Sequence, residues 1–160
     1  MRGEQEVNRA LERYADTVRR LCMIHLKNHA DTEDIFQNVF LKYVLREEPF
    51  ESEEHEKAWF IRVTINACRD LLRSLLRART VSLDEVLEQP APIPPDHREV
   101  LEAVLSLPTK YRQVVYLHYY EGYTAPQIAG ILGKNVNTVY TLLTRSRQQL
   151  REKLGGDRDE

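Results

Sequence analysis

Apolar residues recur three or four positions apart along most of the chain, and no stretch shows a pairing pattern typical of β-strands. From Glu4 to His29 this spacing predicts one long amphipathic helix. A second apolar stripe follows Asp31, an acidic residue suited to capping a helix N-terminus, through ADTEDIFQNVFLKYVLREE. A third helix is expected in KAWFIRVTINACRDLLRSLLRAR, which begins at Lys57. The first half of the chain is therefore expected to be entirely helical.

The helical pattern stops between residues 80 and 95, where four prolines lie close together. Because proline lacks an N–H and restricts the backbone, this stretch predicts an extended linker. Asp96 and Glu99 then resemble a capping box at the start of a helix. A further helix is expected over 109–121, with an apolar side formed by Val114, Val115, Leu117 and Tyr119.

The stretch from Thr124 to Leu154 predicts two short helices joined by a tight turn, a helix-turn-helix. Thr124 and Gln127 form a capping box, Gly133 suits a left-handed helix end, and Asn137 suits the N-cap of the second helix. The core face of that helix is expected to be Val139, Leu143, Ser146 and Leu150. The other face of this helix carries Thr138, Thr141, Thr144, Arg145, Gln148 and Gln149. These side chains can contact base edges and phosphates in a major groove, or they can form an ordinary solvated surface.

We therefore predict an all-α fold with two small helical domains. The first covers residues 1–79 and the second, which contains the helix-turn-helix, covers 96–154. A Pro-rich linker over 80–95 joins them, and a short tail follows over 155–160.

The charges are segregated, which changes the meaning of a net charge of only −2. Residues 58–79 carry five arginines against Asp70 alone, and residues 134–153 carry five basic residues against Glu152 alone. Such a chain can present basic faces to phosphates and acidic faces to another protein.

Other chemistry receives little support from the sequence. Cys22 and Cys68 are best interpreted as small buried residues, and His25 and His29 lack the intervening Glu of a zinc-protease motif. We expect no metal, no cofactor and no catalytic residues. The chain has no apolar run long enough for a membrane span and no signal-peptide core, so a cytoplasmic protein without membrane insertion is expected.

Two helical faces each allow a purely structural interpretation and a functional one. A polar face with Asp34, Gln37 and Asn38 is, by itself, best explained as solvated surface. The aromatic and basic face that follows Trp59 can stack on and hydrogen-bond an unstacked base, or it can be the outer side of a helix with a buried Trp.

Three blocks, in this order and with the Pro-rich linker between the second and third, resemble the extracytoplasmic-function (ECF) group of bacterial RNA polymerase sigma factors. They are ADTEDIFQNVFLKYV, KAWFIRVTINACRDLLRS and LPTKYRQVVYLHYYEGYTAPQIAGILGKNVNTVYTLLTRSRQQL. The resemblance implies a helix that binds the polymerase clamp, a helix that melts and reads the minus-10 promoter element, and a domain that reads the minus-35 element.

The resemblance also implies roles for single residues. Asp34 and Gln37 match clamp-contacting residues, with Asn38 in place of the usual Glu. Ile65 stands where Arg is common, and the loop over 50–57 resembles one that captures a flipped base. Trp59, Arg62 and Asn66 match family residues, with Asn66 the first candidate for a base contact. Together with Arg69 and Arg73 on the same helix, they are the predicted minus-10 contacts.

For the minus-35 element, Arg145 and Arg147 match family arginines, whereas Tyr140 and Leu142 replace basic residues. These replacements are expected to weaken independent DNA binding. The predicted minus-35 contacts are Thr124, Asn137, Thr138, Tyr140, Thr141, Arg145 and Arg147.

We expect a non-catalytic initiation factor that binds core RNA polymerase and promoter DNA and is controlled by an anti-sigma factor. Two other classes stay open: an autonomous helix-turn-helix regulator and a protein-interaction module whose DNA binding has been lost.

Overall fold

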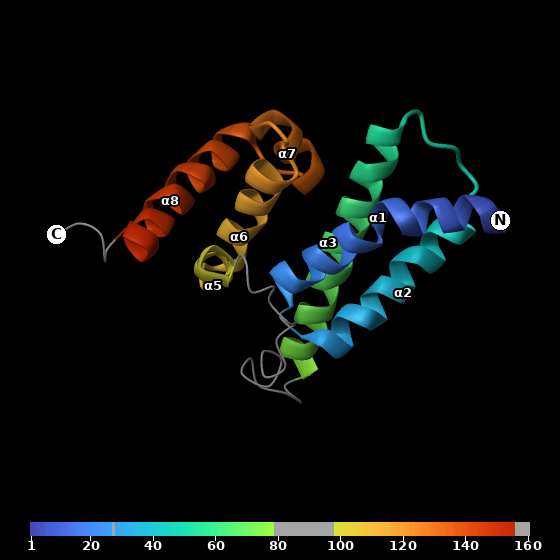
Figure 1. The fold of residues 1–160 in the computed structure, drawn as a ribbon, viewed down its shortest axis with the longest axis horizontal. Coiled ribbons are helices and arrows are strands. Elements are labelled where there is room, and N and C mark those ends of the chain that lie inside the picture. The colour runs from blue at the N-terminus through green and yellow to red at the C-terminus, as the bar shows by residue number, and fades with distance from the viewer. Residues whose placement is uncertain (27, 79–97, 156–160) are drawn as a thin grey trace. The chain divides into compact units, whose positions relative to one another are not determined.

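The computed structural model describes residues 1–26, 28–78 and 98–155, and within these ranges every regular element is a helix (Figure 1). The chain forms two compact units, Met1–Ala91 and Pro92–Glu160. The predicted all-α, two-domain architecture is confirmed. The predicted linker, the Asp96 half of the capping box and most of the tail lie outside the described residues.

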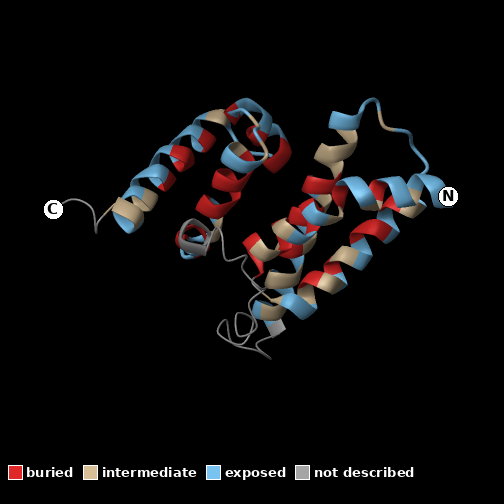
Figure 2. Cartoon of the chain, in the orientation of Figure 1, coloured by how far each residue is buried: buried red, intermediate tan, exposed pale blue. Residues whose placement is uncertain are grey.

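The described residues of the first unit form α1 (Glu4–His25), α2 (His29–Leu45) and α3 (Glu53–Ala78). Each of them packs against the other two, and their buried residues face inward (Figures 1 and 2). The fully buried ring of Phe60 lies at the centre of this core. Its centroid lies 4.7, 5.1 and 5.0 Å from the centroids of Tyr14, Phe40 and Tyr43. One aromatic side chain of α3 therefore contacts both other helices.

The first helix is shorter than predicted. It ends at His25, and His29 begins α2, so the two histidines do not share a helix. The Nδ1 atom of buried His25 lies 2.8 Å from the Leu21 carbonyl oxygen of its own helix. The prediction that Asp31 caps α2 is wrong, because Asn28 is the N-cap and its Oδ1 accepts the Asp31 N–H at 3.0 Å.

Helix α3 begins at Glu53, four residues before the predicted Lys57. Ser52 precedes it, and its Oγ accepts the backbone N–H of His55 at 3.1 Å, which satisfies one of the free donors at a helix start. The first turn carries Glu53, Glu54 and Glu56, whose charges complement the positive end of the helix dipole.

The two cysteines meet in the core of the first unit. Both side chains are fully buried, and the Sγ of Cys68 lies 4.0 Å from that of Cys22. They are free thiols, as predicted. The contact with Cys22 and burial raise the pKa of the Cys68 thiol, so both groups act as small apolar core residues.

The second unit contains α5 (Arg98–Leu105), α6 (Thr109–Val115), the π-helical turn η2 (Tyr116–Tyr120), α7 (Ala125–Leu132) and α8 (Val136–Gly155). Helix α8 packs against α5, α6 and α7. The centre of this core is fully buried and consists of Val114, Leu117, Ile128, Val139 and Ser146.

The helix expected over 109–121 changes character at its end. The Glu121 N–H donates to the Tyr116 carbonyl oxygen at 3.1 Å, a five-residue spacing, and the rings of Tyr116 and Tyr120 stack 5.2 Å apart. Tyr119 in this turn is 54% exposed, so it does not join the core with Val114, Val115 and Leu117 as expected. Gly122, with φ of +80°, then reverses the chain.

The helix-turn-helix is confirmed, with one change. Thr124 and Gln127 form the predicted capping box, with bonds of 3.3 and 2.9 Å, and Gly133 has the left-handed φ of +66°. The cap of α8 is Asn135, whose Oδ1 accepts the Asn137 N–H at 2.8 Å. Asn137 is therefore inside the helix, exposed and available for other contacts.

Candidate protein and nucleic-acid interfaces

An exposed stripe runs along α2 on the side opposite its core face. Asp34, Gln37 and Asn38 are exposed on it, as predicted for a contact surface. Leu41 and Leu45 extend the same stripe and are 56% and 59% exposed. These five side chains fall within about 100° of arc, since each residue turns a helix by about 100°. We call them the α2 stripe.

The two leucines of the α2 stripe were missed by sequence reasoning. Leu41 and Leu45 follow Asn38 at three and seven residues, a spacing that places them beside the polar trio and away from Val39 and Tyr43. That offset from the core face was the available signal. Neighbouring apolar side chains that stay exposed make this stripe a candidate protein contact surface.

The aromatic and basic side chains of α3 share one face. Arg62, Asn66 and Arg73 are exposed, while Trp59 and Arg69 are half-buried. All five fall within about 80° of arc, opposite the core residues of the same helix. Ile65, at the position where the family often has Arg, is 2% exposed and belongs to the core. The structure brings together the whole predicted set for the minus-10 element.

Trp59 belongs to an aromatic cluster at the start of α3. Its ring makes edge contacts with Phe50 at 5.7 Å and Phe60 at 5.1 Å, and the Arg46 guanidinium lies 5.7 Å from it. Because Trp59 is half-buried, part of its ring is packed and part remains accessible. The two interpretations of this Trp are therefore compatible: it packs against the core and still offers a stacking surface.

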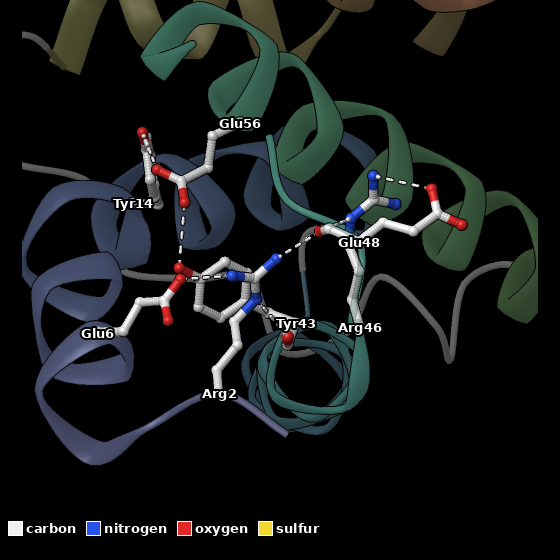
Figure 3. A network of polar contacts seen from close by, with 7 residues as sticks. All are labelled: Arg2, Glu6, Tyr14, Tyr43, Arg46, Glu48 and Glu56. Atoms are coloured by element: carbon white, nitrogen blue, oxygen red, sulfur yellow. Dashed lines mark hydrogen bonds and ion pairs between the residues drawn. The ribbon is translucent and has the colours of Figure 1, made fainter. Parts of the chain in front are cut away.

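The loop over residues 46–52, which we call the α2–α3 loop, is held by arginines (Figure 3). The Glu48 carbonyl oxygen accepts from Arg2 Nη2 at 2.9 Å and from Arg46 Nε at 3.3 Å. At the other end of the loop, the Glu51 N–H donates to His55 Nδ1 at 3.0 Å. This acidic loop therefore has a defined backbone path beside Trp59.

The carboxylate of Glu56 connects helices α1, α2 and α3. Glu56 on α3 accepts the hydroxyl proton of Tyr14 on α1 at 2.9 Å and that of Tyr43 on α2 at 3.0 Å (Figure 3). Burial and the contact with Glu56 raise the pKa of Tyr43 to about 12 and that of Tyr14 still further. The two protonated hydroxyls therefore connect the first turn of α3 to α1 and α2.

Helix α8 presents the predicted minus-35 residues on its exposed surface, but not on one line. Asn137, Thr138, Thr141 and Arg145 lie along one side. Arg145 and Arg147 lie about 160° apart around the helix, since two residues turn it by about 200°. Thr124, also exposed, is used as the cap of α7. The structure therefore does not bring the two arginines to the same side.

Tyr140 and Leu142 are not equivalent departures from the family pattern. Tyr140 is 52% exposed, whereas Leu142 is 7% exposed and packs in the core. Leu142 itself therefore faces the core and offers DNA no contact, while the expected weakening of DNA binding by this replacement stays a prediction. Only Tyr140 replaces a basic residue on the exposed face.

An apolar groove that sequence reasoning did not anticipate lies beside α8. It has a volume of about 510 Å³ and is lined by Val104, Val115, Tyr119, Arg147, Leu150, Arg151, Leu154 and Gly155. Arg147 thus lies at the edge of this groove. Its residues are scattered over α5, α6, η2 and α8, so only the fold could reveal them.

Both units match models of known families. Residues 10–78 match the sigma-70 region 2 model, and residues 97–150 match the sigma-70 region 4 model. The RNA polymerase sigma factor SigV of Bacillus subtilis (strain 168) is 31% identical over 138 residues, which is 84% of this chain and 82% of SigV. The ECF RNA polymerase sigma factor SigW of the same strain is 27% identical, over 88% of this chain and 84% of SigW.

Solved structures share the fold. RpoE in complex with the anti-sigma factor NepR from Bartonella quintana superposes with a TM-score of 0.78 and 22% identity, covering 94% of this chain and 98% of RpoE. CnrH in complex with the cytosolic domain of CnrY has a TM-score of 0.67 and 22% identity, covering 99% and 92%.

Helical units with these faces and these relatives define a promoter-specificity factor of transcription. The chain belongs to the ECF group of sigma-70 family RNA polymerase sigma factors. It is a transcription initiation factor that binds core RNA polymerase and directs it to promoters through their minus-10 and minus-35 elements. An autonomous helix-turn-helix regulator is not favoured. Among the described residues, no helix combines the length and apolar character that crossing a bilayer requires.

Proposed function

We propose that the two functions of the sigma factor are divided between domains at residues 1–79 and 96–154, with 80–95 as the connection and 155–160 as a tail. The first domain binds polymerase and melts the minus-10 element, and the second reads the minus-35 element. The observation that carries this proposal is the single face of α3, where aromatic, amide and guanidinium groups lie opposite the core.

The α2 stripe is the proposed polymerase-binding surface. Asp34, Gln37 and Asn38 supply a charge and hydrogen-bonding groups, while Leu41 and Leu45 supply apolar area at the same place. Such a mixture is typical of interfaces in which apolar anchors contribute affinity and a polar rim sets orientation.

The α3 face and the α2–α3 loop are the proposed minus-10 surface. Asn66 is proposed to contact a base edge, and Trp59 and Phe50 offer aromatic surface for an unstacked base. Arg62, Arg69 and Arg73 continue along the same face and are proposed to contact phosphates.

The exposed side of α8 is the proposed minus-35 surface. Asn137, Thr138, Thr141 and Arg145 are proposed to enter the major groove, and the Thr124 hydroxyl at the start of α7 to contact the backbone. Tyr140 and Arg147 lie toward the opposite edge of the exposed surface and are proposed to contact a flanking phosphate or sugar.

Two further properties belong to this proposal. The solved relatives RpoE and CnrH are each in complex with another protein, an anti-sigma factor in the case of RpoE, and we propose that an anti-sigma factor also controls this chain. We also propose that the protein works in the cytoplasm and performs no catalysis itself, as the family of its relatives suggests.

The decisive test measures whether core polymerase together with the full chain forms an open complex on a promoter that the protein recognises. Gln37→Ala is expected to lower affinity for core polymerase, whereas Asn66→Ala lowers promoter opening and leaves that affinity intact. Glu12→Ala on α1 and Ser74→Ala on α3, both exposed, are matched controls and are expected to change neither. Equal loss of both activities in Asn66→Ala contradicts its assigned role.

A further inference from the structure

Arg2 connects the start of the chain to the end of α2. Its backbone N–H donates to the Val44 carbonyl oxygen at 3.0 Å, and its Nε donates to the Tyr43 carbonyl oxygen at 3.1 Å. The last carbonyls of a helix lack partners within the helix and carry the negative end of its dipole. The backbone N–H and the guanidinium of Arg2 therefore each donate to one carbonyl at the α2 C-terminus, and the guanidinium charge complements the helix dipole there.

The same guanidinium reaches into the α2–α3 loop. Its Nη2 donates to the Glu48 carbonyl oxygen at 2.9 Å, and its Nη1 forms an ion pair with Glu6 on α1 (Figure 3). The Arg2 side chain is only 10% exposed, although its bonds to Glu48 and Glu6 lie at the surface. One side chain thus links α1, the last turn of α2 and the loop.

Two guanidinium groups lie close to the ring of Phe50. The Cζ atoms of Arg2 and Arg46 lie 5.1 and 4.5 Å from its ring centroid, within the range of cation–π attraction. Its ring also stacks on Tyr43 at 6.1 Å and meets Trp59 edge-on at 5.7 Å. The position of Phe50 beside Trp59 therefore depends on the arginines as well as on aromatic packing.

We propose that Arg2 is a positioning residue for promoter opening: it fixes the α2–α3 loop so that Phe50 and Trp59 form a preorganised surface for an unstacked base. The promoter-opening part of this inference rests on the proposed function of the loop. Arg2 itself does not contact the base. Its planar fork spans two carbonyl oxygens at once, which the single ammonium of Lys cannot reproduce.

The structural part can be tested on the free protein, because Trp59 is the only tryptophan of the chain. Arg2→Ala and Arg2→Lys are compared with Arg9→Ala, which removes an exposed cation from α1. We expect acrylamide to quench Trp59 more strongly in both Arg2 variants, and loop amides to exchange about tenfold faster, equivalent to about 1.4 kcal/mol. Circular dichroism checks that each variant is folded. Quenching and exchange equal to those of Arg9→Ala overturn the proposal.

The functional part uses holoenzyme on a promoter with 2-aminopurine in the minus-10 element. Both Arg2 variants are expected to keep their affinity for core polymerase and to open the promoter about tenfold more slowly, by the same free-energy conversion. If the Arg2 variants loosen the loop but the holoenzyme opens the promoter at an unchanged rate, the proposed role of Arg2 in promoter opening is overturned. If the unmodified protein opens no promoter, the proposed function fails, while the quenching result still decides whether Arg2 holds the loop.

Discussion

Tyr140 and Leu142 lie two residues apart on α8, yet Tyr140 is 52% exposed and Leu142 only 7%. In an α-helix, two residues separate side chains by about 200°, so one of the pair faces the surface and the other the core. The two positions therefore respond differently to a basic side chain.

Tyr140→Lys is expected to strengthen minus-35 binding by the holoenzyme. An added phosphate contact steepens the dependence of log affinity on log salt by about 0.9. Stability should stay within about 0.5 kcal/mol of the original protein, as is usual for exposed positions. Salt titrations of binding to a minus-35 duplex measure the slope, and an unchanged slope places Tyr140 outside the interface.

Leu142→Arg is expected to destabilise the second unit. The larger, charged side chain must displace core neighbours or turn outward, at a cost of about 1–3 kcal/mol. Urea unfolding of the full chain measures this cost, with Thr144→Arg as the exposed control on the same helix. If the Leu142→Arg variant is as stable as the original protein and binds DNA more strongly, an arginine at this position can reach the surface and the prediction is wrong.

The leucines of the α2 stripe are expected to matter for binding and not for folding. Leu41→Ser together with Leu45→Ser should leave the unfolding free energy nearly unchanged, because both side chains are more than half exposed. Affinity for core polymerase should fall at least about tenfold if each leucine contributes about 1 kcal/mol at the interface. Thermal unfolding and a polymerase-binding titration, run side by side, separate the two effects.

Alkaline pH is expected to loosen the first unit. Burial and the bond to Glu56 raise the pKa of Tyr43 from 10.0 to about 12, so the protonated hydroxyl is favoured in the folded state. The stability that this preference contributes is complete below pH 10 and is lost as the pH rises toward 12. Urea midpoints across this window should fall less steeply in Tyr43→Phe. Parallel curves for the two proteins would show that the Tyr43 hydroxyl does not contribute.

The thiols of Cys22 and Cys68 are expected to be unreactive in the folded protein. Both are fully buried, and the pKa of Cys68 is raised, which keeps the nucleophilic thiolate scarce. Ellman's reagent should detect neither thiol in buffer and both in denaturant. Rapid labelling of the native protein would indicate that α1 and α3 separate readily.

Sequence periodicity predicted the helices because their core faces are regular, as the burial of Phe60, Ile128 and Val139 shows. The capping box at Thr124 could be predicted because both of its residues are neighbours in sequence. The caps Asn28 and Asn135 were missed because several polar residues near each helix start could serve, and only the backbone path selects one.

The candidate sites also contain one part that the local sequence predicts and one part that it does not. The α3 face follows from spacing alone, but the loop geometry depends on Arg2, which is more than 40 residues from Tyr43 and Glu48 in sequence. No local pattern could predict that contact. The burial of Leu142 was obscured by the family pattern, which places a basic residue there.

The π-helical turn at Tyr116–Tyr120 also affects how this protein can be compared with its relatives. A π turn accommodates one residue more than an α turn, and one residue corresponds to about 100° of rotation about the helix axis. The direction of the backbone between η2 and α7 therefore depends on the number of residues in that turn as well as on their side chains. A change of one residue in this turn is expected to alter the direction of α7 relative to α6, so a comparison of α8 sequences alone leaves out part of what orients the reading helix.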